Sequence, residues 1–324
     1  MSSTSSAAAI INYKGAILDA LKTHRDYQKT QSDGAFRVAA YNKVIEKING
    51  LDTIRSLADL EEVLPKTKGS EIRKKVIEVL ETGSLASAEA IKANPTNDIL
   101  ELFQGIYGIG PKAAQELIDL GMKSIGDLRS HPELLNKKQA IGLKYYEEIK
   151  ERIPRSEMVA HESLLLKTLP AGITGTIAGS YRRGKPSSGD VDLLLRSGDE
   201  KVLKEVVLRL IDMKYIIEVL ASGSKKFMGI CRLGTGVARR IDILLTSPEE
   251  YAYALLTFTG SDRYNVSVRG HALSLGYSLN EHGLTLTKKG ILGAVKLPTE
   301  PLLTEEAVLG FLGLPYVKPE DREL

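Results

Sequence analysis

The stretch Ala178-Gly-Ser-Tyr-Arg-Arg-Gly-Lys-Pro-Ser-Ser-Gly-Asp-Val-Asp-Leu-Leu-Leu195 decides the fold of this chain. Its last part alternates acidic and apolar residues, which is typical of a half-buried strand. Asp190 and Asp192 are two residues apart, so their carboxylates project from the same face of that strand. Two such carboxylates repel each other unless a divalent cation lies between them. Oxygen ligands favour magnesium or manganese over zinc.

A third aspartate, Asp242, lies in the apolar segment Arg239-Arg-Ile-Asp-Ile-Leu-Leu245, which we also expect to form a strand. A buried aspartate is costly unless it is paired or bound to a metal ion. Pairing of the two strands would gather all three carboxylates. Three carboxylates are the minimum for two-metal phosphoryl transfer, in which one ion activates an attacking hydroxyl and both stabilise the developing charge.

Positive charge precedes the aspartate pair. We expect Gly179-Ser180 to form a tight turn that offers a hydroxyl and backbone N–H groups, and Arg182, Arg183 and Lys185 follow it. A triphosphate requires such donors. Each piece alone has an ordinary explanation, as a plain turn, a solvated strand end or solubilising charge. Their occurrence together and in this order favours a phosphoryl-transfer site.

The composition is that of a soluble globular protein. The chain has 324 residues, with 43% hydrophobic and 26% charged residues, so two or three small domains are expected. The net charge of +3 permits a polyanionic partner without requiring one. No apolar run is long enough to cross a membrane, and the N-terminus lacks the basic segment of a secretory signal. We expect a protein that is neither secreted nor bound to a membrane.

A single cysteine, Cys231, lies in an apolar segment. It cannot form an internal disulfide or a cysteine-based zinc site, so we expect a core residue and a reducing, intracellular compartment.

The periodicity of apolar residues changes along the chain. It is helical from about residue 13 to a stop at Thr82-Gly83, and again from 99 to 149, with a Gly- and Pro-containing boundary over 83–98. After Pro154, short β-branched segments predict strands over 173–178, 191–195, 216–220, 227–233 and 240–245, with helices over 202–210, 249–256 and 266–275. An all-helical half followed by an α+β half is therefore expected.

Six segments of the chain match the motifs of a known protein family. They are Gly179–Gly184, Ser188–Asp192, Phe227–Gly229, Arg239–Ile243, Phe258–Asp262 and Tyr316–Arg322. With them the chain resembles the family X DNA polymerases, in a layout closest to that of polymerase beta, over nearly all residues after about Ala9. The resemblance implies a multi-domain protein with an all-α N-terminal region of helix-hairpin-helix type, followed by an α+β polymerase domain of the nucleotidyltransferase fold.

Five regions follow from that resemblance. They are a disordered tail at 1–12, a helical lyase-like domain at 13–92, a helix-hairpin-helix DNA-binding subdomain at 93–150, a catalytic palm at 151–260 and a nucleotide-selection subdomain at 261–324.

The resemblance also implies roles for single residues. Asp190 and Asp192 would bind both metal ions, and Asp242 would bind the catalytic ion and help to deprotonate the primer 3′-hydroxyl. The residues implied for the triphosphate are Arg152, Gly179, Ser180, Arg183, Ser188 and Gly189. Those implied for the sugar and base are Thr257, Phe258, Gly260, Asp262 and Asn265, and those for the DNA strands are Arg240 and Arg269.

Three positions depart from the family pattern. Relatives usually carry an aromatic residue in place of Thr257, beside the sugar, so exclusion of ribose is expected to be weaker here. Leu244 replaces an arginine that pairs with a catalytic aspartate in polymerase beta, and His282 replaces a tyrosine. Control of closure is therefore expected to differ.

Gly105-Ile-Tyr-Gly-Ile-Gly-Pro-Lys-Ala-Ala114 resembles a helix-hairpin-helix. Gly108 and Gly110 would let backbone N–H groups approach a phosphate, with Lys112 beside them. Alone, such a turn is more often structural, but in this domain order it indicates a grip on DNA that ignores sequence. In the family the hairpin also holds sodium or potassium through backbone carbonyls, here those of Gln104, Ile106 and Ile109.

The first helical region resembles a 5′-deoxyribose-phosphate lyase domain, in which an amine forms a Schiff base with a sugar aldehyde. A lysine beside apolar surface suits this chemistry. On the expected helix over 72–81, Lys75 lies at the edge of an apolar stripe, whereas Lys74 lies on the polar face, where a pair with Glu78 is expected. Periodicity and alignment to Thr82-Gly83 both favour Lys75.

The lyase assignment has a competing interpretation. The family's first hairpin is replaced by Leu64-Pro-Lys-Thr-Lys-Gly69, and basic residues that the family carries at positions 71 and 87 are lost. Another of the family's basic residues is replaced by Arg37, while Tyr41 still matches a family tyrosine near the lyase lysine. The basic run that includes Lys68 could instead hold the 5′-phosphate of a gap.

The leading hypothesis is a monomeric, template-directed polymerase that fills short gaps in gapped or nicked DNA during base excision repair, with magnesium or manganese and deoxynucleoside triphosphates (dNTPs). It would work in the nucleus or another compartment that contains DNA. Template-independent addition is a competitor, disfavoured by the short segment between Leu233 and Arg239. A non-catalytic DNA-binding protein is another, disfavoured because no carboxylate is lost.

Overall fold

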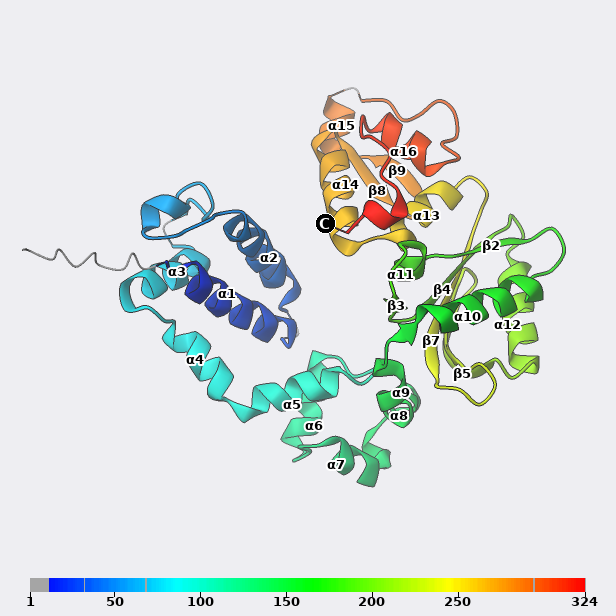
Figure 1. Cartoon of the computed structure of the whole chain (residues 1–324), viewed down its shortest axis with the longest axis horizontal. Coiled ribbons are helices and arrows are strands. Elements are labelled where there is room, and N and C mark those ends of the chain that lie inside the picture. Colours follow the sequence, from blue (N-terminus) through cyan, green and yellow to red (C-terminus); the bar gives the residue numbers. More distant parts are fainter. Residues whose placement is uncertain (1–11, 32, 68, 294, 324) are drawn as a thin grey trace, which may run out of the picture. The chain divides into compact units, whose positions relative to one another are not determined.

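The computed structural model of the chain describes residues 12–31, 33–67, 69–293 and 295–323. The chain divides into two compact units between Lys144 and Tyr145, and the labelled strands all belong to the second unit (Figure 1). Most of the predicted tail at 1–12 and the predicted DNA contact Lys68 lie outside the described residues.

The described part of the first unit contains helices and no strand. The helices are α1 (Lys14–Lys29), α2 (Ala35–Asn49), α3 (Glu71–Thr82), α4 (Ala86–Ala93), α5 (Pro95–Gln104), α6 (Pro111–Asp119), α7 (Ile125–Ser130) and α8 (Lys137–Lys144), with short 3-10 helices at Leu57–Leu60 and Pro132–Leu134. The predicted boundary over 83–98 therefore holds helix α4 and the start of α5, and the division into compact units falls later in the chain.

Helix α3 shows how local signals set these elements. The hydroxyl of Ser70 accepts a hydrogen bond from the backbone N–H of Arg73 and caps the first turn. The helix ends before Gly83, whose φ of 84° is left-handed, as the sequence predicted. Its buried face, with Val76 and Val79 at 0% and 1% exposure, packs into a core shared with α1, α2 and α4.

The second unit is α+β, as predicted. Its strands are β1 (Ile153–Pro154), β2 (Thr174–Ile177), β3 (Ser187–Ser188), β4 (Val191–Arg196), β5 (Ile216–Ser222), β6 (Lys226–Cys231), β7 (Arg239–Thr246), β8 (Tyr277–Asn280) and β9 (Gly283–Leu286). Its helices are α9 (Tyr146–Lys150), α10 (Arg155–Thr168), α11 (Gly179–Arg182), α12 (Lys201–Asp212), α13 (Tyr251–Thr259), α14 (Asp262–Ser274), α15 (Lys288–Leu292) and α16 (Glu305–Phe311), with a 3-10 helix at Pro319–Asp321.

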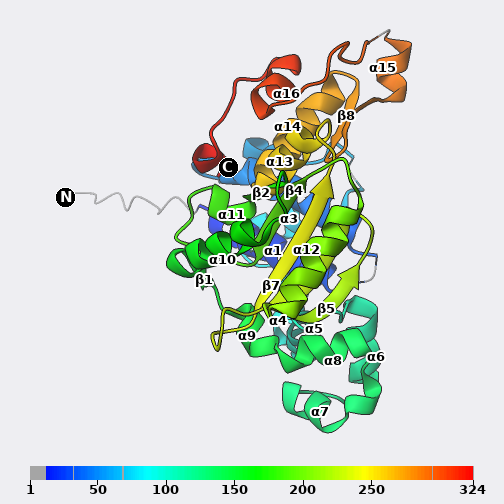
Figure 2. The same cartoon turned by 90° about the vertical axis from the view of Figure 1, so that its right-hand side faces the viewer.

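The main sheet has five strands in the order β2-β4-β7-β6-β5. The central pair, β4 and β7, is parallel, and the other pairs are antiparallel. Helices α10 and α12 lie over one face of this sheet (Figure 2). The opposite face carries the side chains that alternate with this core, among them Asp192 and the buried Leu194 of β4.

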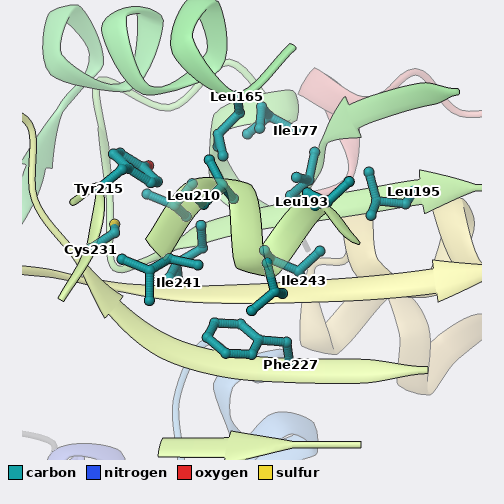
Figure 3. Close-up of a cluster of buried hydrophobic side chains, with 14 of the residues drawn as sticks. Leu165, Ile177, Leu193, Leu195, Leu210, Tyr215, Phe227, Cys231, Ile241 and Ile243 are labelled. Atoms are coloured by element: carbon teal, nitrogen blue, oxygen red, sulfur yellow. The ribbon is translucent and has the colours of Figure 1, made fainter. Parts of the chain in front are cut away.

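The core of this unit lies between the sheet and those two helices. Leu165 of α10 and Leu210 of α12 meet Leu193 and Ile243 from the central strands (Figure 3). Cys231, fully buried beside Tyr215, belongs to the same cluster, and burial raises the pKa of its thiol to about 12. The cysteine is therefore a core residue, as the sequence indicated.

The ring of Phe227 in β6 explains why the motif Phe227–Gly229 ends in glycine. Its ring is 1% exposed, and a Cβ at Gly229 would lie 2.7 Å from it and 2.8 Å from the carbonyl oxygen of Glu218. Glycine at position 229 is thus needed because the ring and the neighbouring backbone fill the space of a side chain.

A second core joins α13, α14 and α16 to the β8–β9 hairpin through residues such as Leu256, Tyr264 and Leu309. None of the described helices is both long and apolar enough for a membrane span.

Replacing Phe227 by alanine is expected to lower the free energy of unfolding by about 3–5 kcal/mol, because it leaves a cavity at the centre of the core. The measurement is denaturant unfolding followed by circular dichroism. The control is Leu208→Ala on α12, at a side chain 50% exposed, where a change below about 0.5 kcal/mol is expected. Equal effects of the two substitutions would contradict this description of the core.

Candidate functional site

The three predicted carboxylates lie on the sheet face away from α10 and α12. Parallel pairing of β4 with β7 sets Asp192 directly beside Asp242. Along β4, Val191 and Leu193 turn into the core, so Asp192 between them turns to the opposite face. The sequence predicted that pairing of these strands would bring their aspartates together, and the strands do pair.

Asp190 immediately precedes β4 and shares a cation with Asp242. One terminal nitrogen (Nη2) of Arg240 lies 3.5 Å from Asp190 Oδ2 and 3.4 Å from Asp242 Oδ1. Lys226 Nζ lies 3.7 Å from the other oxygen of Asp242. Arg240, which the resemblance assigned to DNA, therefore faces the carboxylates in this structure.

The environment of these carboxylates disfavours negative charge. Burial, and after it the neighbouring Asp190 and Asp242, raise the pKa of Asp192 to about 7. Burial also raises the pKa of Asp190, with Arg240 acting in the opposite direction. A bound cation would reverse these shifts, because it stabilises the charged carboxylates.

The carboxylates fit a divalent cation chemically. In the described part of the chain, no three Asp, Glu, His or Cys side chains are arranged closely enough to enclose a metal ion. Strand register nevertheless puts Asp192 beside Asp242, and Asp190 reaches the same arginine as Asp242. Three oxygen ligands with excess negative charge are the donor set that hard cations prefer.

The turn before β4 is shaped by this cluster. Gly179 opens the short helix α11 with a φ of 58°, and a Cβ there would lie 2.2 Å from Asp192 Oδ2. The carboxylate thus packs against the backbone of the turn, and only glycine leaves room for it. Ser180 is thereby held next to the aspartates.

An open cleft of about 590 Å³ lies beside the carboxylates. It gathers all of the residues that the sequence assigned to the nucleotide except Ser188 and Asn265. Its lining comprises Arg152, Gly179, Ser180, Arg183, Lys185, Pro186, Ser187, Gly189, Asp190, Asp192, Thr257, Phe258, Gly260 and Asp262.

The two exceptions adjoin the cleft. Ser188 pairs in register with Ile153, and its hydroxyl is buried without a hydrogen-bond partner among the described residues. Asn265 donates from Nδ2 to the carbonyl oxygen of Thr257 at 2.7 Å, so its amide is held by a residue of the lining. Both groups are hydrogen-bonding atoms that a ligand in the cleft could engage.

Arg183 has partners that the sequence did not reveal. It donates from Nη1 to the carbonyl oxygen of Thr259 at 2.6 Å and from Nε to Glu323 at 2.5 Å. Lys185 Nζ lies 3.3 Å from the same carboxylate. Sequence spacing gives no signal for this contact, because Glu323 is 140 residues away from Arg183.

A buried ion cluster was not predicted from the sequence. Glu305 of α16 is 4% exposed and accepts from Arg182 at 2.7 Å and from Arg322 at 2.7 Å. Arg322 is completely buried. The cluster ties α11, at the carboxylates, to α16. The signal available in the sequence was the family match at Tyr316–Arg322, which gave no partner for Arg322.

The other predicted DNA contacts of this unit lie at the surface. Arg269 Nη2 is 3.8 Å from Glu281 Oε2, with both side chains about two-fifths exposed. His282, which stands where polymerase beta has tyrosine, lies 3.4 Å from Glu250. Leu244 projects from β7 on the same face as Asp242 and is paired in register with Leu194.

In the first unit, α5 and α6 flank the predicted hairpin turn. Gly108 has a φ of 90°, and Gly110 is the N-cap of α6. Lys112 is 85% exposed at the start of that helix, 3.8 Å from Glu116. The carbonyl oxygen of Ile106 accepts a hydrogen bond from the N–H of Ile109 at 3.0 Å.

Lys75 and Lys74 differ as periodicity predicted. The side chain of Lys75 is 17% exposed and that of Lys74 60% exposed. The predicted partner of Lys74 was wrong: its amine pairs with Glu71 at 2.8 Å, while the carboxylate of Glu78 accepts from the N–H of Ala86. Glu78 is drawn away because the backbone that begins α4 needs an acceptor.

His24 lies near Lys75 and was not singled out from the sequence. Its ring stacks on Tyr41 with centroids 6.2 Å apart, and Nε2 lies 2.9 Å from Ser87 Oγ. Burial, and then the charge of Lys75, lower the pKa of His24 to about 4, so the imidazole is neutral at pH 7. Arg37, also assigned to this region, pairs with Asp33 at 2.5 Å at the surface.

Three models of polymerase domains match consecutive parts of this chain. The family model for the DNA polymerase beta palm matches residues 152–248, that for the fingers domain of DNA polymerase lambda matches 101–150, and that for the DNA polymerase beta thumb matches 254–323.

Two curated relatives extend the similarity to most of the chain. DNA polymerase lambda of Rattus norvegicus is 36% identical over 272 residues, covering 79% of this chain and 47% of the relative. DNA polymerase lambda of Arabidopsis thaliana is 33% identical over 310 residues, covering 89% of this chain and 58% of the relative. The chain thus spans about half the length of these relatives. From the paired aspartates, the cleft and these matches, we conclude that the chain belongs to the family X DNA polymerases.

Proposed function

We propose that this protein is a template-directed DNA polymerase that adds deoxynucleotides to a primer 3′-hydroxyl. The observation that carries the proposal is the pairing of Asp192 with Asp242 beside a cleft lined by Ser180 and Arg183. Its expected substrates are a dNTP and short gaps or nicks in DNA, as in base excision repair. We further propose that it works as a monomer in the nucleus or another intracellular compartment that contains DNA.

Family X DNA polymerases use divalent metal ions. We propose magnesium, or manganese, held by Asp190, Asp192 and Asp242; such ions would lower the pKa of the attacking hydroxyl and offset the charge that develops on the phosphate oxygens. Asp242 would take the proton of the primer 3′-hydroxyl. The 3′-oxygen then bonds to the α-phosphorus while the bond to the β-phosphate oxygen breaks and pyrophosphate leaves.

The triphosphate would take the donors that line or adjoin the cleft. The hydroxyl of Ser188 is suited to this because it is buried and has no described partner. Arg183 and Ser180 add a guanidinium and a hydroxyl, and Arg152 is held ready by two hydrogen bonds to Ser187.

Reading of a template would fall to the C-terminal part of the cleft. Phe258 and Gly260 would pack on the sugar, Asp262 on the base, and Asn265 would bond its minor-groove edge. Release of the Asn265 amide from the Thr257 carbonyl would free it for that bond. Arg269 would contact the template strand.

Template-independent addition is the alternative within the same fold. The connection between β6 and β7 is short, covering residues 232–238, and Glu148 holds it through Arg232 and the N–H of Ala238. Such a loop offers little chain to take the place of a template, which supports templated synthesis.

We propose that the first unit grips DNA and carries the lyase activity. The Gly108–Gly110 turn would hold a phosphate, with sodium or potassium bound by the carbonyls of Gln104, Ile106 and Ile109. Lys75 would form the Schiff base. Its low exposure and the neutral His24 beside it support that role.

Asp192→Ala is expected to lower the rate of primer extension by about a thousandfold, since loss of a metal ligand removes several kcal/mol of transition-state stabilisation. Single-turnover extension of a labelled primer with magnesium measures it. The matched control is Asp212→Asn at the exposed end of α12, which should extend as fast as the parent. If Asp192→Ala also kept the parental rate, the aspartate assignment would be wrong.

The parent protein is expected to fill a one-nucleotide gap bearing a 5′-phosphate faster than it extends an open primer-template, and not to extend single-stranded primer. Deoxy- and ribonucleotides compared in parallel test the role of Thr257. Rapid tailing of single-stranded primer would instead favour the template-independent alternative.

Lys75→Ala is expected to abolish borohydride trapping of the protein on an incised abasic site, because reduction fixes only a Schiff base to the reacting amine. Lys74→Ala is the matched control, since it removes the neighbouring amine from the exposed face and should leave trapping intact. Trapping that survives in Lys75→Ala but not in Lys74→Ala would reassign the nucleophile.

A further inference from the structure

The carboxylate of Glu323 pairs with two of the cations that line the cleft, Arg183 and Lys185. Arg183 Nε donates to Glu323 Oε1 at 2.5 Å, and Lys185 Nζ lies 3.3 Å from Glu323 Oε2. Each oxygen of the carboxylate thus meets one cation. The side chain of Arg183 is only 15% exposed, so this contact is better shielded from water than a typical surface ion pair.

Glu323 is held in this position by its neighbours. The carbonyl oxygen of Arg322 accepts from the hydroxyl of Ser261 at 2.6 Å. The guanidinium of Arg322 pairs with the buried Glu305 at 2.7 Å. Its guanidinium carbon (Cζ) also lies over the rings of Tyr264 and Tyr316, at 5.3 and 5.7 Å from their centroids. Because residue 322 is anchored on three sides, the next residue is kept close to Arg183 and Lys185.

Arg183 is held through two of its three nitrogens. Its Nη1 donates to the carbonyl oxygen of Thr259, and a Cβ at Gly260 would lie 3.1 Å from the same nitrogen. The side of the guanidinium that carries Nε is the side that Glu323 fills. A phosphate that needs this donor must therefore displace the carboxylate.

The charge of Glu323 persists at neutral pH. The hydrogen bond from Arg183, and then that from Lys185, hold the pKa of Glu323 below its usual range. The carboxylate is 36% exposed, so water can reach it and stabilise it after displacement. A charged, partly hydrated group is easier to exchange for a phosphate than a fully buried one.

We propose that Glu323 is an internal competitor of the nucleotide's triphosphate. Its carboxylate holds Arg183 and Lys185 in the absence of nucleotide, and the triphosphate takes over both cations when it enters. The inference rests on the proposed function, because it concerns the same cleft. Its consequence is that the affinity for nucleotide depends on how much more tightly the two cations bind the triphosphate than the Glu323 carboxylate. Entry of the nucleotide frees the Glu323 side chain from Arg183 and Lys185 while Arg322 stays anchored.

The test is Glu323→Gln, which keeps the size of the side chain and removes its charge. The KM for dNTP in gap filling is expected to fall about two- to fivefold with kcat unchanged, the range that a partly exposed ion pair contributes. Binding of tripolyphosphate without DNA, followed by calorimetry, should tighten by a similar factor. Asp321→Asn is the matched control. It removes one charge two residues away, at an exposed side chain, and should leave both quantities unchanged.

A second comparison separates the loss of the Glu323–Arg183 contact from the change in net charge that Glu323→Gln also causes. In an Arg183→Ala background, Glu323→Gln should tighten tripolyphosphate binding by a smaller factor than in the parent, because Lys185 is then the remaining contested cation. An unchanged or weaker binding of tripolyphosphate by Glu323→Gln, or an equal gain from Asp321→Asn, would overturn the proposal. The calorimetric result does not depend on catalysis, so it stands apart from a failure of the parent protein to extend a primer.

Discussion

The parallel pairing of β4 with β7 is the constraint on which the candidate site depends. In this register Asp192 lies beside Asp242, while Leu193 and Ile243 face the helices on the other side. A shift of one residue would turn the apolar side chains out and the carboxylates in, so the core protects the register. The cost of this arrangement is visible in Asp192, whose pKa is raised to about 7 by burial and by the neighbouring carboxylates.

The surrounding cations offset that cost locally. Arg240 lies between Asp190 and Asp242, and Lys226 approaches Asp242 from the next strand. A few residues upstream the charges are reversed: the cations Arg183 and Lys185 are close together there, and the carboxylate of Glu323 pairs with both. The site is therefore composed of acidic and basic groups that hold one another where a metal ion and a triphosphate would otherwise do so.

The cluster of Arg182, Glu305 and Arg322 links this chemistry to the C-terminal part of the unit. Buried ion pairs are weak evidence for stability but strong determinants of geometry, since a misplaced partner leaves a charge buried alone. Here the cluster fixes α11, which shapes the backbone against Asp192, and residue 322, which positions Glu323. One buried carboxylate thus orients groups on both sides of the cleft.

Much of the architecture could be predicted because it depends on local periodicity. Alternation placed the strands and the faces of Asp192 and Asp242, and the 3.6-residue repeat distinguished Lys75 from Lys74. The pairing of Lys74 with Glu78 could not be judged in this way. Several partners satisfy the same spacing, and the start of α4 competes for the glutamate.

By itself, the sequence determined the types of element, the face of each carboxylate, most of the residues that line the cleft and the family. These follow from short-range patterns and from motifs that are contiguous in the chain. Only the tertiary structure decided which groups those residues meet: Arg240 with the aspartates, His24 with Tyr41, and Glu323 with Arg183. Partners far apart in sequence leave no periodic signal, because their contact arises only when separate elements pack together.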